Sequence, residues 1–160
     1  MKKLFASIIV IFALLVGSQA MATWTLTPAL VAQAGHYVKW SLTCTSNASA
    51  LSATDILAVS GMPPRLLKLI SGSTLMLMKV YPGESSVIPD TTINIILSDD
   101  EADALYTKTA ISKDAISWHD LSSDIDAYPP ITGSLYLTLN DIGSAGDQVT
   151  LYFICWRETI

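Results

Sequence analysis

Charged residues are scarce in this chain of 160 residues. Lys, Arg, Asp and Glu make up 14% of it, whereas an average globular protein carries about 25%. The few charges are also unbalanced, with 9 basic residues against 14 acidic ones. Nucleic-acid binding needs clustered Lys and Arg, so the composition excludes a nucleic-acid partner. Binding to an anionic membrane surface is disfavoured for the same electrostatic reason.

Histidine is rarer still, with two residues, and the sequence has no GxSxG or HExxH motif. A hydrolase needs a nucleophile, a base and a group that orients the base. His119 precedes Asp120 and could pair with it as base and orienting acid. Neighbouring residues rarely point at each other in that way, so a surface-loop histidine is the simpler interpretation. His36 begins a predicted strand. We therefore predict no catalytic residues and no enzyme, and a small hydrolase using His119 is the weakest hypothesis.

The two cysteines, Cys44 and Cys155, belong to no CxxC pair, which excludes a thioredoxin-type or cysteine-metal site. An exported chain could join them in a disulfide. On the chain-entropy model that bridge would close a loop of about 110 residues and contribute up to about 4–5 kcal/mol. The alternative is a pair of buried free thiols that act as small hydrophobic side chains.

Acidic residues cluster twice, and clustered carboxylates are the ligands of many metal sites. Calcium prefers several carboxylate oxygens within one turn, but the EF-hand spacing with its central glycine is absent. The first cluster suits the start of a short helix capped by an aspartate. A glycosidase could use paired carboxylates, but it needs a larger scaffold. We predict no metal and no cofactor at either cluster: Asp99, Asp100, Glu101 and Asp103 in the first, Asp120, Asp124 and Asp126 in the second.

One long hydrophobic run stands out, the thirteen residues 4–16, which follow Lys2 and Lys3. Small residues then lead to exits after Ala20 or Ala22. A positive start, a short apolar middle and a small-x-small exit are typical of a secretory signal. Thirteen helical residues span about 20 Å, too short for a hydrocarbon core of about 30 Å. We predict a hydrophobic signal helix at residues 1–22, with an uncleaved N-terminal anchor as the alternative.

The leader holds two of the basic residues and no acidic one, so the remainder carries 7 basic and 14 acidic residues, a net charge of −7. Apolar residues alternate with polar ones in much of this remainder, as they do in half-buried strands. In residues 36–45, for example, Val38, Trp40, Leu42 and Cys44 share one face. Further strands are predicted at 23–27, 65–70, 74–81, 92–97, 134–140 and 148–156.

This pattern predicts one all-β domain over residues 23–160, an antiparallel β-sandwich of the jelly-roll or Ig-like type. Residues 71–73, Ser-Gly-Ser, predict a hairpin between 65–70 and 74–81. The one helical candidate is 99–105, and residues 112–130 are predicted to form a long surface loop.

The four tryptophans are the remaining candidates for a binding surface. Trp40 lies in the inward phase of its strand and is predicted to be core. Trp156 is out of phase with Cys155 and should face outward, and Trp24 should be partly exposed, whereas Trp118 falls in the irregular region. Exposed tryptophans can serve as ligand platforms or protein-contact anchors, but no cluster is visible in the sequence, and ordinary sheet packing is the favoured interpretation.

The order of features from residue 87 onward forms a larger pattern. It comprises Pro-Asp-Thr-Thr at 89–92, a strand at 93–97, the turn Ser98-Asp99-Asp100, Asp103-Ala104-Leu105, a long polar loop, the segment from Gly133 to Gly143, and Gly146 to Tyr152. This order resembles small all-β proteins encoded in the structural-gene regions of tailed bacteriophages and prophages. The resemblance implies a virion accessory or decoration protein that packs against copies of itself or against a shell or tail protein.

We therefore expect a non-enzymatic structural or interaction protein, phage-related and part of a repetitive assembly. Virion proteins assemble without an export signal, so this hypothesis makes Met21 the working start and the virion the location. The alternative is a secreted, periplasmic or cell-surface β-sandwich that grips a glycan or protein by exposed aromatic residues. Membrane contact is expected only through an uncleaved leader.

Overall fold

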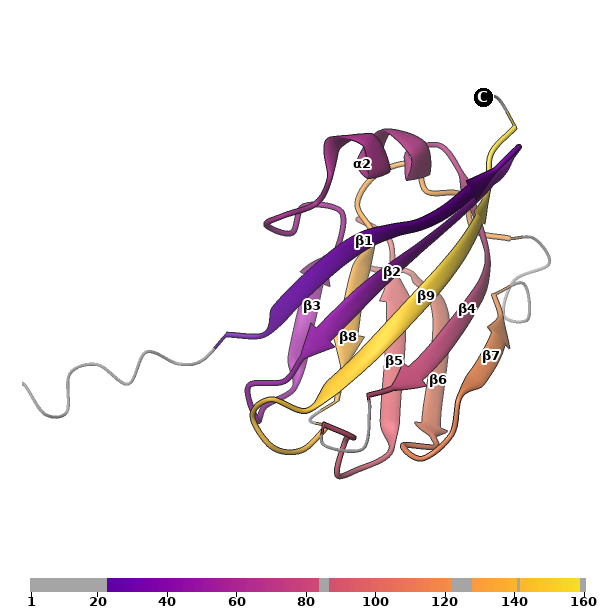
Figure 1. The fold of residues 1–160 in the computed structure, drawn as a ribbon. Coiled ribbons are helices and arrows are strands. Elements are labelled where there is room, and N and C mark those ends of the chain that lie inside the picture. The colour runs from indigo at the N-terminus through magenta and orange to yellow at the C-terminus, as the bar shows by residue number, and fades with distance from the viewer. Residues whose placement is uncertain (1–22, 84–86, 122–127, 141, 159–160) are drawn as a thin grey trace, which may run out of the picture.

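A computed structural model describes residues 23–83, 87–121, 128–140 and 142–158. Two antiparallel β-sheets lie face to face, and a short helix covers one end (Figure 1). The all-β prediction is therefore confirmed. The predicted signal helix at 1–22 lies outside the described residues. Among the residues that are described, no helix is long and apolar enough to span a membrane.

The five-stranded sheet has the order β1-β2-β9-β4-β7, and the four-stranded sheet has the order β3-β8-β5-β6. The strands of the first are β1 (Thr25–Ala34), β2 (Tyr37–Thr45), β9 (Gln148–Trp156), β4 (Thr74–Pro82) and β7 (Ser117–Asp120). Those of the second are β3 (Leu51–Asp55), β8 (Tyr136–Leu139), β5 (Ile93–Ser98) and β6 (Ala104–Ile111). The helix is α2 (Pro64–Ile70).

The pairing of the strands follows a simple rule. β2 pairs with β9, β3 with β8, β4 with β7, and β5 with β6, all antiparallel. The chain thus runs outward from β2 to β5 and returns from β6 to β9 alongside its own outward path. The pairs fall alternately in the two sheets, so this long hairpin is wrapped around the core.

Alternation explains why β2 and β9 lie at the centre of the five-stranded sheet. Every second residue of both strands is buried, as the sequence predicted for Trp40 and Cys44. The Trp40 and Phe153 rings stack with centroids 4.5 Å apart. Burying a side chain such as Leu151 stabilises the fold by about 1.5–3 kcal/mol relative to an exposed position.

The predicted strand at 65–70 and its hairpin with β4 are wrong, because this segment forms α2. Pro64 supplies a fixed φ in the first helical turn, where its missing N–H costs nothing. Leu66 and Ile70, four residues apart, then share one helix face and are both buried. Gly72, at φ +74°, turns the chain from the helix into β4.

The predicted helix at 99–105 is also wrong. A carboxylate oxygen of Asp99 accepts hydrogen bonds from the backbone N–H of Glu101, at 3.1 Å, and of Asp103, at 2.9 Å. These bonds close a tight turn, and β6 begins directly after it. The predicted loop at 112–130 is interrupted by β7. Its residues 122–127 lie outside the described part of the chain.

Of the two alternatives for Cys44 and Cys155, the structure has the buried free thiols and not the disulfide. The two residues lie on neighbouring strands, but Cys44 is opposite Val149 and Cys155 is opposite Val38. Six strand positions therefore separate them, roughly 20 Å at about 3.3 Å per residue. A disulfide needs its Cα atoms within about 7 Å. Both residues are buried free thiols, and burial raises the pKa of Cys155 to about 11.

Candidate functional site

His119 and Asp120 do not form the catalytic pair that the sequence suggested as one interpretation. Successive residues of a strand point to opposite faces; on β7, His119 is opposite the buried Met78, whereas Asp120 is opposite Leu77. The His119 ring instead contacts the Ser117 hydroxyl, with Nε2 and Oγ 2.8 Å apart. Partial burial lowers the pKa of His119, and the positive charge of Lys108 lowers it further.

The other predicted polar sites are also placed by the structure. The Nδ1 atom of His36 lies 2.8 Å from the carbonyl oxygen of Arg157, and its ring stacks on Trp156. Within the described residues no three His, Cys, Asp or Glu side chains are grouped closely enough to hold a metal ion. Asp124 and Asp126 lie outside the described residues. The first acidic cluster is the Asp99 turn.

The outer face of the five-stranded sheet carries the most distinctive group of side chains. Lys39 of β2 and Lys79 of β4 both lie over the ring of Tyr152 on β9. The Nζ atom of Lys39 is 5.3 Å from the ring centroid, and that of Lys79 is 5.5 Å from it. The Nζ of Lys79 also lies 5.4 Å from the ring of Trp118 on β7. We call these four residues the lysine–aromatic strip. It crosses four adjacent strands.

Register explains how the strip forms. Lys79 is directly opposite Tyr152 on one neighbouring strand and opposite Trp118 on the other. Directly opposed side chains on one face are close enough to interact. Each cation–π contact at such an exposed site contributes about 0.5–1 kcal/mol. The contacts therefore fix the lysine side chains across the sheet surface and leave their charge at the surface.

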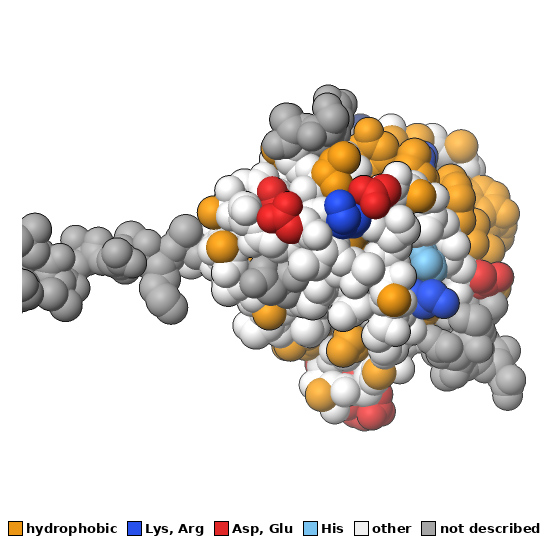
Figure 2. All heavy atoms as spheres, turned by 90° about the horizontal axis from the view of Figure 1, so that it is seen from below, with side chains coloured by type: hydrophobic (Ala, Val, Ile, Leu, Met, Phe, Trp, Pro, Cys, Tyr) orange, Lys and Arg blue, Asp and Glu red, His pale blue; other side chains and the backbone are white. Residues whose placement is uncertain are grey.

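A second aromatic group lies at one end of the same face. The Tyr37 and Trp156 rings meet edge to face, with centroids 4.8 Å apart. Trp156 thus faces outward, as predicted. Tyr37 is 48% exposed and Trp118 56% exposed, large values for aromatic side chains, which more often bury their surface. The end-on view in Figure 2 shows hydrophobic side chains gathered along one side of the surface.

The electrostatics of this face differ from those of the chain as a whole. Strands β1, β2, β4 and β9 contain no Asp or Glu, and their charged residues are Lys39 and Lys79. Asp120 lies on β7, at the edge of the sheet. In a chain with a net charge of −5, the centre of this sheet therefore presents positive charge and aromatic rings.

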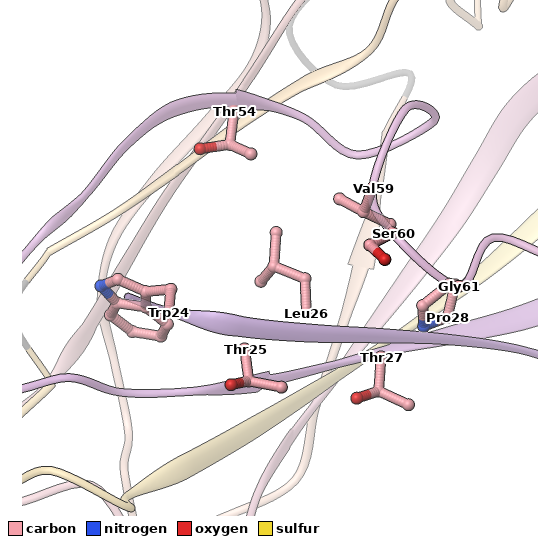
Figure 3. Close-up of a pocket in the computed structure, with 9 residues that line it drawn as sticks. All are labelled: Trp24, Thr25, Leu26, Thr27, Pro28, Thr54, Val59, Ser60 and Gly61. Atoms are coloured by element: carbon pink, nitrogen blue, oxygen red, sulfur yellow. The ribbon is translucent and has the colours of Figure 1, made fainter. Parts of the chain in front are cut away.

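A groove lies at the opposite edge of the molecule, between β1 and the segment that follows β3 (Figure 3). Its volume is about 450 Å³, and its lining contains no charged residue. Leu26 points into it, facing Thr54 and Val59, whereas Thr25 and Thr27 point away (Figure 3). The Trp24 indole is partly exposed, as predicted, and its N–H donates to the Ser49 carbonyl oxygen at 2.9 Å.

Sequence reasoning singled out the tryptophans but missed the lysines and tyrosines of this face. Alternation placed Lys39 and Tyr152 in the outward phase of their strands, which was the available signal. The sequence does not reveal which strands are neighbours, so the strip could not be assembled from it. Trp40, the most buried of the tryptophans, is core as predicted.

Comparison with known proteins gives no family for this chain. No protein-family model matches it, and neither a search of curated proteins nor a search of solved structures finds a significant match. A fold alone does not determine function, so function has to be argued from the surfaces.

Proposed function

We propose that this protein is a non-enzymatic structural protein with a jelly-roll domain, serving as a virion accessory or decoration protein in a repetitive assembly. The strand pairing is the observation that carries the proposal. A long hairpin wrapped so that β2 pairs with β9, β3 with β8, β4 with β7 and β5 with β6 has the order of a jelly roll. Viral capsid proteins use this architecture, as do lectins and cupins.

The surfaces support a role in contacts rather than in chemistry. On the outer face of the four-stranded sheet, Asn94, Ile96 and Ser98 of β5 alternate with buried residues of the same strand. Ile96 is 38% exposed. The outer face of the five-stranded sheet carries the lysine–aromatic strip. Interface cores are depleted in charge, as the outer face of β5 is, and enriched in Tyr and Trp, which the strip supplies.

The resemblance to phage structural proteins covers the tip of the wrapped hairpin and part of its returning half. The quoted segments correspond to β5, the Asp99 turn, β8 and β9. These elements include the tip of the hairpin and its closing strand, which pairs with both β2 and β4. The resemblance therefore concerns part of the same hairpin whose strand pairing supports the proposal.

Purified particles from the producing cells test the proposal. We expect the chain to co-purify with virions or other particles in stoichiometric amounts, with an N-terminus at Met21 or one residue later. Mass spectrometry of gradient fractions gives both results. Recovery of all the protein as a soluble monomer in the periplasm or the medium would refute the virion function.

An exported binding module is the second candidate, favoured by the exposed rings of Tyr37 and Trp118 behind a signal-type leader. Aromatic rings on a sheet face can stack against sugar rings or anchor a protein contact. This function predicts an N-terminus at Met21 or Thr23 in an extracytoplasmic fraction. It also predicts that Trp118→Ala weakens retention on a polysaccharide or receptor column, whereas the same change at a buried position would unfold the domain.

A further inference from the structure

We propose that the lysine–aromatic strip binds the acidic Asp99 turn of a second copy of this chain, so that copies associate head to tail. The inference rests on the proposed function and specifies how the repetitive assembly is made. The strip supplies positive charge and aromatic rings, and the turn supplies the complementary negative charge.

The strip presents two positive charges, and the one carboxylate among the strands of this sheet, Asp120, lies on the edge strand β7. Lys39 and Lys79 lie over the same tyrosine ring, and none of β1, β2, β4 and β9 contains a carboxylate. Like charges held near each other at low ionic strength repel, and an acidic partner relieves that repulsion. The partner expected on this face is therefore acidic.

The aromatic rings give the same face anchoring groups for a protein. Trp118 is more than half exposed and lies at one end of the strip. Tyr and Trp dominate the binding energy of protein interfaces when they are buried by a partner. A face with both lysines and exposed rings suits an acidic protein surface better than a free anion, which would use the lysines alone.

The chain itself offers such a surface at the tip of the wrapped hairpin, between β5 and β6. Asp100, Glu101 and Asp103 are exposed there, while Asp99 holds the backbone of the turn through two hydrogen bonds. The turn is thus ordered before binding, which lowers the entropic cost of association.

The positions of the two surfaces set the symmetry of the contact. The turn joins β5 and β6 of the four-stranded sheet (Figure 1). The strip lies on the outer face of the five-stranded sheet. When two copies are joined by a single turn–strip contact, one turn and one strip stay free at the ends of the pair. Such a heterologous contact propagates into a ring or a filament.

Sedimentation velocity of the protein purified after expression of the full chain tests the inference. One variant reverses the strip, K39E/K79E, and a second reverses the turn, D100K/E101K/D103K. We expect the wild-type protein to self-associate at low salt and less so at high salt. Each variant alone should associate at least about ten-fold more weakly, because like charges then face each other. An equimolar mixture of the two variants should regain association, because each strip meets a complementary turn.

Matched controls separate charge at the contact from charge in general. R65E/K68E, on α2, changes the net charge by as much as K39E/K79E does and should associate like the wild type. K39Q/K79Q tests the strip without adding acid, and circular dichroism establishes that every variant is folded. If a reversal variant fails to fold, the association of K39Q/K79Q and the salt dependence of the wild type decide whether the strip binds the turn.

Unchanged association of K39E/K79E, or a mixture that stays monomeric, would overturn the inference. Wild-type protein found in particles but monomeric in solution would overturn it and leave the proposed function standing. Protein that neither associates nor enters particles would end both. Binding of the monomer to an acidic polysaccharide through Lys39 and Lys79 would replace the inference with the exported-module function.

Discussion

The two buried thiols give the most direct test of the fold. Cys44 and Cys155 lie on neighbouring strands, six positions out of register, and both are enclosed by the core. Burial raises the pKa of Cys155 from its usual 9.0 to about 11, and it raises the pKa of Cys44 in the same direction. Only the thiolate reacts with a disulfide reagent. A shift of about two pKa units lowers the thiolate fraction of Cys155 at neutral pH about a hundredfold.

The assay is thiol titration of protein purified without reductant, first native and then in denaturant. We expect no fast reaction in the native state and two reactive thiols per chain after unfolding. Native reactivity should be suppressed by more than the hundredfold pKa effect, because the reagent also has no access to the sulfur atoms. Unfolded protein with no reactive thiol would mean that the cysteines are bridged, and the β2–β9 register would then be wrong.

The same pKa shift sets the behaviour of the fold in alkali. A thiol whose pKa is raised by folding keeps its proton when the unfolded chain has lost it, so stability falls as the pH rises above about 9. For Cys155 the loss amounts to about 2 kcal/mol by the time the pH reaches its folded pKa. Urea unfolding at pH 7, 9 and 10.5 measures it, and Cys155→Ala, which removes one of the two titrating thiols, should weaken the dependence.

Three further predictions follow from single contacts. Phe153→Ala should lower the free energy of unfolding by about 3–5 kcal/mol, because it empties a core position, whereas Tyr152→Ala on the outer face should cost less than about 1.5 kcal/mol in the same urea titration; equal losses would contradict the two-faced β9. Asp99→Ala should cost about 1–2 kcal/mol by removing two hydrogen bonds to backbone N–H groups, and Asp99→Asn should retain much of that; no loss in thermal unfolding would count against the turn. The pKa of His119, followed by NMR, should lie below 6.5 and rise in Lys108→Gln. Because folding lowers the pKa of His119, its contribution to stability is present above pH 6.5 and is lost as the pH falls below it.

Much of the fold could be predicted from alternation, and its failures have physical causes. The strands at 36–45 and 148–156 were predictable because both keep a strict period of two with one buried face. Residues 65–70 are a short apolar run, which periodicity alone cannot assign to helix or strand. Pro64, at the first helical position, was the signal in the sequence that favours a helix here. The sequence at Asp99 is typical of a helix N-terminus, but the Asp99 side chain accepts the backbone hydrogen bonds of a tight turn instead.

The candidate site could hardly be predicted from the sequence, because it depends on the order of the strands in the sheet. Lys39 and Tyr152 are more than a hundred residues apart in the sequence, and they meet only because β2 and β9 pair. Lys79 joins them through the second neighbour of β9. Composition alone predicted that the chain would have few charges. It could not show that both lysines lie on the central strands, which contain no carboxylate.

The edges of the five-stranded sheet bear on how copies of this protein associate. An open edge pairs with another chain unless something interrupts it. On β1 the interruptions are Pro28, which has no N–H to donate, and the register shift between Leu30 and Ala32. At the other edge, β7 is four residues long. Edge-to-edge pairing is thus hindered on both sides, which leaves the faces of the sheets for association. The outer face of this sheet is where the lysines and the exposed rings lie, and an assembly built through it needs no new β-pairing.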